Sequence, residues 1–151
     1  MNVAKACQKN VITIGRFDEL WKAVQLMRER HVGYLVVVEP DAAEALQRPV
    51  GVLTDRDILI TVTAREADAH ALRVDDVMTR QPLTVSETES IDKALRDMRR
   101  IGVRRVPVTG PRGELSGILS LDDVLDVLAS ELQNVAGSIH HGREIEGTLR
   151  P

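Results

Sequence analysis

Two short motifs combine a hydroxyl side chain with a carboxylate three residues later. Thr54 precedes Asp57 in the segment GVLTDRD, and Ser120 precedes Asp123 in the segment GILSLDD. An ionised carboxylate only accepts hydrogen bonds, so each pair suits a ligand with neighbouring hydroxyl groups, such as a ribose. The same spacing forms a capping box, in which the two side chains satisfy free N–H groups at a helix start. The spacing leaves ligand binding and helix capping open, and one pair can serve both roles.

Positive charge gathers before a β-branched run of the second half of the chain, at Arg99, Arg100, Arg104 and Arg105. Guanidinium groups bind phosphate oxygens through paired hydrogen bonds, which makes these residues candidates for an anion site. They equally suit a solvated basic face that complements the C-terminal dipole of the preceding helix. Successive strand residues point to opposite faces, so we expect Arg105 rather than Arg104 to enter a cleft. Arg56, inside the first motif, is a further candidate for supplying charge.

Both motifs lie in two copies of one unit. Residues of the first copy recur 71 positions later, where Thr13, Leu20, Ala23, Met27 and Val32 match Thr84, Ile91, Ala94, Met98 and Val103. At the two motifs the offset falls from 71 to 66, because the first copy carries a loop five residues longer. A unit of this size cannot bury its apolar face alone, so the two copies are expected to pack together.

The two copies differ at the positions that carry charge. Gly33 and Tyr34 stand in place of the two arginines before the strand, and Asp122 stands in place of Arg56. We therefore expect two unlike clefts, of which at most one binds a charged nucleotide well. The arginines are expected to act beside Asp123, which leaves weaker or uncharged ligands to the cleft of the first motif.

The periodicity predicts the elements that position these residues. In each copy an apolar stripe of period 3.6 indicates an amphipathic helix, followed by two β-branched runs that indicate paired strands at residues 35–38 with 50–54 and 106–109 with 115–120. A second helix follows each strand pair. In residues 121–132 its apolar width, at Val124, Val127 and Leu128, exceeds one stripe, so we expect the helices after Thr54 and Ser120 to form a homodimer contact. After residue 132 three glycines interrupt the pattern, and we expect a flexible tail at 133–151.

Composition narrows the function. The net charge is −3 and the pI is near 5.8, which disfavours nucleic acid or an anionic membrane as main partner. The sequence shows no membrane-spanning run and no secretory leader, so we expect a cytoplasmic protein. A lone cysteine, Cys7, fits a reducing compartment and is expected to be buried rather than reactive. His140 and His141 lack partners at a metal-ligand spacing, and no catalytic motif is found, so neither a metal site nor an enzyme is expected.

The chain resembles the cystathionine β-synthase (CBS) domain pair, as found in small stand-alone bacterial proteins. The resemblance rests on DVMT at 76–79, GVRRVPV at 102–108 and the two segments that hold the motifs, and covers about residues 3–132. It implies an α+β fold of two β-α-β-β-α repeats, at 3–66 and 74–132, related by a pseudo-twofold axis.

The resemblance also implies two clefts that commonly bind adenosine nucleotides. Thr54, Asp57, Ser120 and Asp123 match the positions that contact ribose, and Arg104 and Arg105 match basic positions that contact phosphates. The function implied is a regulatory sensor that signals to its own dimer or to a partner protein. The alternative is a structural adaptor that dimerises with unoccupied clefts. The nucleotide (AMP, ADP, ATP, S-adenosylmethionine or NAD), the occupied cleft, the partner and the role of the tail stay open.

Overall fold

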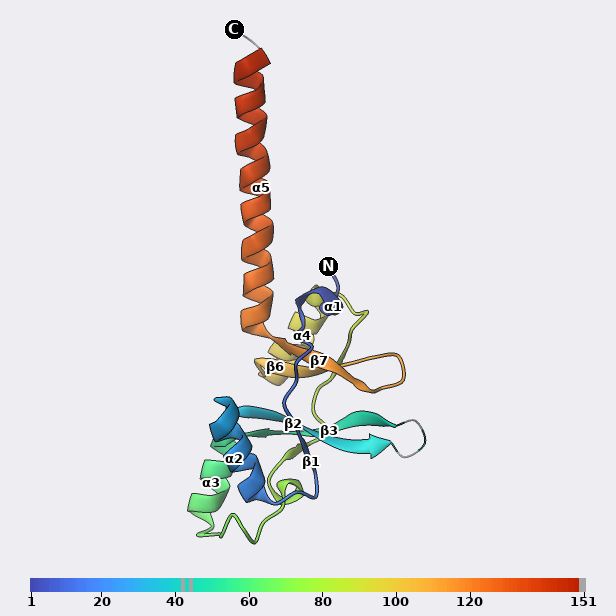
Figure 1. Ribbon diagram of the computed structural model, residues 1–151, viewed down its shortest axis with the longest axis vertical. Helices are drawn as coiled ribbons and strands as arrows, with labels where there is room; N and C mark the ends of the chain where they lie inside the picture. Colours follow the sequence, from blue (N-terminus) through green and yellow to red (C-terminus); the bar gives the residue numbers. More distant parts are fainter. Residues whose placement is uncertain (42, 44, 150–151) are drawn as a thin grey trace.

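The two sequence repeats form two sheets, each with its own helices, and a long C-terminal helix rises from the second (Figure 1). The computed structural model describes residues 1–41, 43 and 45–149. The first repeat comprises β1 (Thr13–Gly15), α2 (Leu20–Arg30), β2 (Tyr34–Asp41), β3 (Leu46–Thr54) and α3 (Asp55–Ala64). The second comprises β5 (Val85–Ser86), α4 (Ile91–Ile101), β6 (Arg105–Thr109), β7 (Leu115–Ser120) and α5 (Leu121–Leu149). Each repeat is preceded by a short segment: α1 (Val3–Ala6) before the first, and the 3-10 turn η1 (Val74–Asp76) with β4 (Thr79–Arg80) before the second.

The strand order shows the same topology twice. In the first sheet β1 is parallel to β2, and β2, β3 and β4 follow as antiparallel neighbours. In the second, β5 is parallel to β6, and β6 is antiparallel to β7. Gln8 forms an isolated bridge with Ile118, at the place that β4 takes in the first sheet. The expected tandem α+β repeat is confirmed.

The predicted apolar stripes bury the same faces of α2 and α4. Leu20, Ala23 and Met27 lie in one core, and Ile91, Ala94 and Met98 lie in the other. α2 ends at His31 and α4 at Gly102, both with a left-handed backbone, at φ 54° and 79° respectively. Glycine adopts this conformation without strain, whereas a histidine there is uncommon.

The segment before each repeat packs into the core of the other one. Val3 and Ala6 of α1 belong to the core of the second repeat, whereas Val74 and Met78 belong to the core of the first. The backbone follows the same path, because Val3 N donates to Glu89 O at 2.8 Å and Val74 N donates to Asp18 O at 2.9 Å. The exchange ties the two units together.

Two expectations about the last helix need correction. Residues 133–149 were expected to lack regular structure, but α5 continues as a helix to Leu149; residues 150–151 lie outside the described part. Val124 and Val127 were expected to form surplus apolar width, but Val124 is buried and Val127 packs on the second core. The physical reason is the exchange of α1, which returns to cover this side of α5. Leu128 alone of the three is exposed.

No helix within the described residues is long and apolar enough to cross a membrane.

Candidate functional site: two clefts between the repeats

A cavity of about 550 Å³ opens between the two repeats, and we name it cleft A. Its walls combine apolar residues of both repeats with a few polar groups. The lining residues are Tyr34, Val52, Thr54, Asp57, Thr79, Gln81, Pro82, Leu83, Ile101, Val103, Arg104, Arg105 and Val106. A volume in this range, apolar walls and a few convergent polar groups are typical of a small-molecule site.

Thr54 and Asp57 form a capping box at the start of α3. Thr54 Oγ1 accepts from Asp57 N at 3.1 Å, and Asp57 Oδ2 accepts from Thr54 N at 3.3 Å. The capping role is therefore present. Asp57 is half-buried and lines cleft A, and among the described residues nothing donates to its second oxygen, Oδ1. The cap holds the carboxylate in place, and one oxygen stays available to a ligand donor.

Positive charge reaches cleft A from the start of β6. Arg104 lies 3.7 Å from Asp122 in an exposed ion pair, which contributes little because water screens it. Arg105 has no carboxylate within ion-pair distance among the described residues, and it faces Tyr34. Burial raises the pKa of Tyr34 well above its usual range, although the nearby Arg105 opposes this shift. The phenol is thus neutral, so the charge of Arg105 is not offset.

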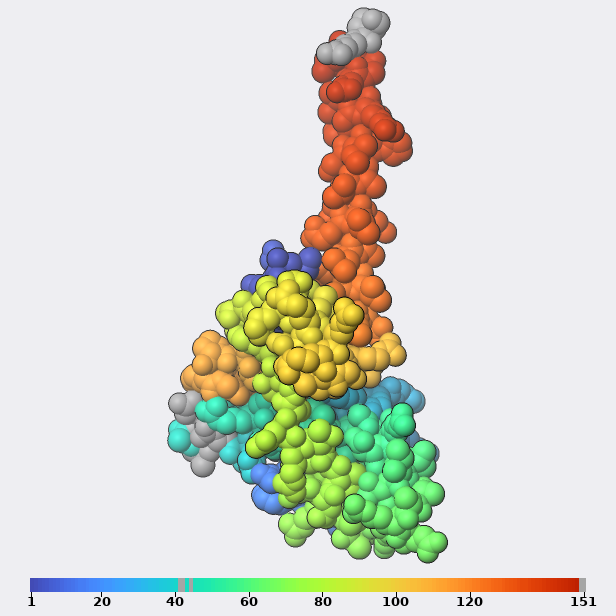
Figure 2. Space-filling view, turned by 180° about the vertical axis from the view of Figure 1, so that it is seen from behind, coloured from blue at the N-terminus to red at the C-terminus, as the bar shows by residue number. Residues whose placement is uncertain are grey.

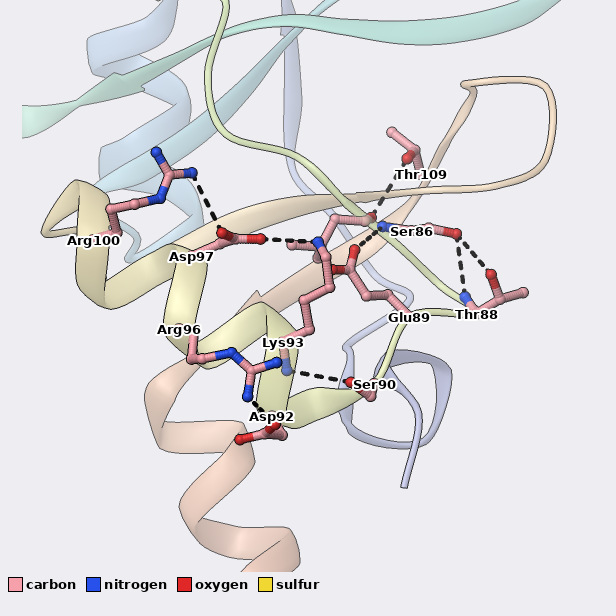
Figure 3. Close-up of polar contacts among 11 residues, drawn as sticks. Ser86, Thr88, Glu89, Ser90, Asp92, Lys93, Arg96, Asp97, Arg100 and Thr109 are labelled. Carbon is pink, nitrogen blue, oxygen red and sulfur yellow. Dashed lines mark hydrogen bonds and ion pairs between the residues drawn. The ribbon is translucent and has the colours of Figure 1, made fainter.

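The other two arginines of the cluster belong to the surface of α4. Arg100 binds Asp97 at 3.3 Å, and Asp97 also binds Lys93, in a chain that Figure 3 follows along the helix. Hydrogen bonds from Lys93, and then from Arg100, lower the pKa of Asp97. Arg100 therefore belongs to a solvated charged face on α4, whereas Arg105 is exposed and also lines cleft A.

A second cavity, cleft B, is the pseudo-twofold counterpart of cleft A and has a volume of about 270 Å³. It is lined by Asn10, Val11, Ile12, His31, Val32, Gly33, Tyr34, Arg105 and Ile118, most of which match residues of cleft A at the repeat offsets. Tyr34 and Arg105 line both cavities.

In the second repeat, protein groups bind both members of the motif, Ser120 and Asp123. Asp123 Oδ2 accepts from Ser120 N at 3.0 Å, and Asp123 N donates to Ser120 Oγ at 3.1 Å, as in the first capping box. Asp123 Oδ1 accepts from the side-chain Nε2 of Gln8 at 3.0 Å. Both carboxylate oxygens thus have partners, and Ser120 is buried.

The structure groups the predicted residues differently from the sequence expectation. Arg104 and Arg105 were expected beside Asp123; instead both line the cleft of Asp57. The reason is that each cleft has one wall from each repeat. Thr54 and Asp57 of the first repeat therefore face the start of β6 in the second repeat. Ser120 and Asp123 line neither cleft, and Arg56 is exposed outside both.

Sequence reasoning missed the segment that leads into the second repeat. Thr79 and Gln81 line cleft A, and the repeat offset of 71 places them opposite Gln8 and Asn10. Asp75 anchors this segment: its Oδ1 lies 2.8 Å from Arg16 Nη2 and 3.0 Å from Arg80 Nη1. The repeat alignment extends upstream to Cys7 and Met78, but no charge or motif at Thr79 or Gln81 pointed to a site.

The short Thr79 and the long Gln8 explain why the carboxylates of Asp57 and Asp123 differ in their partners. Both sit on the strand segment beside the second strand of a repeat, at Val52 and Ile118 respectively. Gln8 spans the gap to the carboxylate of Asp123, whereas Thr79 makes no hydrogen bond to Asp57 in the described structure. No group of three metal-ligating side chains occurs in the described residues.

A family model for the CBS domain matches the chain twice, at residues 3–63 and 74–130. The protein YlbB of Bacillus subtilis is 34% identical over 121 residues, which are 80% of this chain and 76% of YlbB. The protein MK0525 of Methanopyrus kandleri is 28% identical over 127 residues. The aligned residues make up 84% of this chain but 62% of MK0525, so the chain spans less than two thirds of that relative.

Solved structures share the fold. CBSX2 of Arabidopsis thaliana, a CBS-pair protein, matches with a TM-score of 0.74 and 24% identity over 87% of this chain and 96% of that one. The CBS domain pair of protein MJ0100 was solved in complex with 5′-methylthioadenosine and S-adenosyl-L-methionine. It matches with a TM-score of 0.69 and 22% identity over 85% of this chain and 99% of that one.

Proposed function

Since the chain belongs to the CBS domain family, whose paired domains act as regulatory ligand-binding modules, we propose that it senses an adenosine-containing nucleotide bound in cleft A. The observation that carries the proposal is the open carboxylate oxygen of Asp57. It lies in the larger cavity, which two arginines also line.

Each part of a nucleotide has a matching group in cleft A. Thr54 and Asp57 bind the ribose hydroxyls, because a carboxylate oxygen accepts from a diol. Arg105 and Arg104 bind phosphate oxygens, and Arg105 does so without first breaking an ion pair. The apolar side chains of Val52, Val103 and their neighbours provide the wall for the adenine. The adenosine ligands of the MJ0100 domain pair support this class of ligand.

Cleft B is the weaker site in this proposal. Asp123 does not line cleft B, and Gln8 already binds its carboxylate, so a ribose in this cleft finds no free carboxylate oxygen. The volume of cleft B is about half that of cleft A. We therefore expect one ligand per chain at moderate concentration, with AMP, ADP and ATP bound more tightly than adenosine.

The experiment is a titration of the full chain with AMP, ADP, ATP, S-adenosylmethionine and NAD by calorimetry and thermal unfolding. A ligand at about 100 times its Kd stabilises the folded state by roughly 2.7 kcal/mol, which raises the Tm by roughly 5–10 °C. Asp57→Asn should weaken binding by 1.5–3 kcal/mol, the contribution of about one charged hydrogen bond, and Asp123→Asn is the matched control.

The outcomes separate the two candidate functions. Binding that Asp57→Asn weakens and Asp123→Asn preserves supports a sensor that uses cleft A. The reverse pattern places the ligand beside Asp123 of the second repeat and contradicts the assignment. If none of the five ligands changes the Tm or gives a heat signal, the adaptor function with unoccupied clefts replaces the sensor.

A further inference from the structure

α5 leaves the body after its first turns and continues alone. Val124 is buried and Val127 packs on the second core, whereas every described residue from 128 to 149 is exposed. Figures 1 and 2 show the rest of the helix standing clear of both repeats. The helix has 29 residues, which corresponds to a length of about 43 Å at the standard rise per residue.

The exposed part carries an apolar seam in alternating steps of four and three residues. The seam residues are Leu125, Leu128, Leu132, Val135 and Ile139, and the pattern resumes at Leu149 after Gly142 and Glu146. This spacing averages 3.5 residues, the repeat of a coiled coil. Leu125 is 63% exposed and Leu132 is 70% exposed, so the seam has no partner within the described chain.

A helix of this composition does not persist alone in water. Gly137, Gly142 and Gly147 lie in its outer half, and each lowers helix stability about fivefold relative to alanine. Isolated segments of about this length are marginal even without glycine, and proteins stabilise them by packing an apolar face. The seam lies on the side of the helix where such packing is missing, so α5 needs a second surface.

We propose that this surface is the same seam on a second copy of the chain, and that the two α5 helices pair as an antiparallel coiled coil. The two bodies then lie at opposite ends of the pair. The contact differs from the dimer contact expected from the sequence, because Val124 and Val127 face the core and take no part in it.

Side-chain size supports the antiparallel direction. Aligning residue 132 with residue 135 of the second copy places Leu128 opposite Ile139 and Leu125 opposite Gly142, so a large side chain of one copy fills the gap at Gly142 of the other. A parallel pair instead stacks Gly142 on Gly142 and Glu146 on Glu146, which leaves a gap beside two like charges in an apolar seam.

Charge supports the same direction. The antiparallel alignment brings Asp122 near Arg143 of the second copy, and the symmetry of the dimer repeats this opposite-charge pair at the other end. The parallel alignment brings no acidic residue to a basic one at the flanking positions.

The first test is the mass of the full chain by sedimentation equilibrium at tens of micromolar. The seam variant Leu132→Glu/Ile139→Glu is compared with Gln133→Glu/His140→Glu, which puts the same charges one residue along, off the seam. We expect the seam variant to have half the mass of the wild type and less helical circular dichroism, and the control variant to match the wild type. A wild type of 16.7 kDa, or a seam variant with unchanged mass, overturns the proposal.

The second test determines the direction of pairing. In a Cys7→Ala background, Ala129→Cys and Ala136→Cys are prepared as separate single-cysteine chains, mixed and mildly oxidised. The antiparallel alignment brings residue 129 of one copy beside residue 136 of the other, so we expect a mixed disulfide dimer and little of either homodimer. Efficient cross-linking of Leu149→Cys chains to themselves, which joins the two helix ends, overturns the antiparallel arrangement.

Discussion

Tyr34 and Arg105 occupy the same position in the two repeats, and each of them lines both clefts. Each begins the strand that follows the first helix of its repeat, and each pairs across the sheet with the hydroxyl residue of a capping box: Tyr34 with Thr54 and Arg105 with Ser120. A neutral phenol and a permanent cation thus stand at equivalent positions, and because each lines both clefts, the charge of Arg105 reaches both of them.

The charge of Arg105 should favour phosphorylated ligands. Arg105→Ala is expected to weaken ATP and AMP by about 10- to 100-fold, the loss of one charge-assisted hydrogen bond, and to change adenosine binding much less. The difference should shrink as salt screens the charge. Calorimetry at low and high salt measures both effects, with Arg99→Ala as an exposed control. Equal losses for ATP and adenosine would mean that Arg105 does not contact phosphate.

The residues beside the two carboxylates, Thr79 and Gln8, should determine whether each carboxylate is free to bind a ligand. Thr79→Gln places in cleft A the side chain that binds Asp123 in the second repeat, and is expected to weaken nucleotide binding at least tenfold. Gln8→Ala should free Asp123 and raise the number of adenosine molecules bound per chain from one toward two. Equilibrium dialysis counts the sites. A Thr79→Gln variant that binds as tightly as the wild type contradicts the role of this position.

Thr54 should contribute to stability apart from any ligand. Its hydroxyl caps α3, and Thr54→Ala is expected to lower the free energy of unfolding by about 1 kcal/mol, within a usual range of about 0.5–2. Thr54→Ser keeps the oxygen and should restore most of this loss. Urea unfolding without ligand measures it. If the alanine variant is as stable as the wild type, the cap is not the reason for a hydroxyl at this position.

The Asp75 carboxylate should make stability depend on pH. A hydrogen bond from Arg80, and then one from Arg16, lowers the pKa of Asp75 below its ordinary value of 3.8. The contribution is therefore complete above that ordinary value and is lost as the pH falls through the lower folded-state pKa. Asp75→Asn should lower the Tm at pH 7, and the difference from the wild type should shrink toward pH 2. A difference that is constant with pH would exclude the ion pairs as its cause.

The repeat and its consequences could be predicted from the sequence, because they depend on local patterns. Residues 71 apart carry the same apolar stripe, so the two helices Leu20–Arg30 and Ile91–Ile101 and their following strands were identified in both copies. The capping boxes at Thr54 and Ser120 were also identified, since a capping box depends on four consecutive residues. Composition likewise excluded a long apolar membrane span.

The tertiary structure alone decided which residues share a cleft. Sequence position placed Arg105 with Asp123, but the clefts lie between the repeats, so Arg104 and Arg105 meet Asp57 across the interface. The hydrogen bond between Gln8 and Asp123 joins residues 115 positions apart, and no local pattern shows it. The continuation of α5 was missed because glycine was taken as a breaker, although a seam that pairs with another helix can outweigh its propensity. Local patterns depend on neighbours along the chain, whereas a binding site depends on which surfaces the packed repeats bring together.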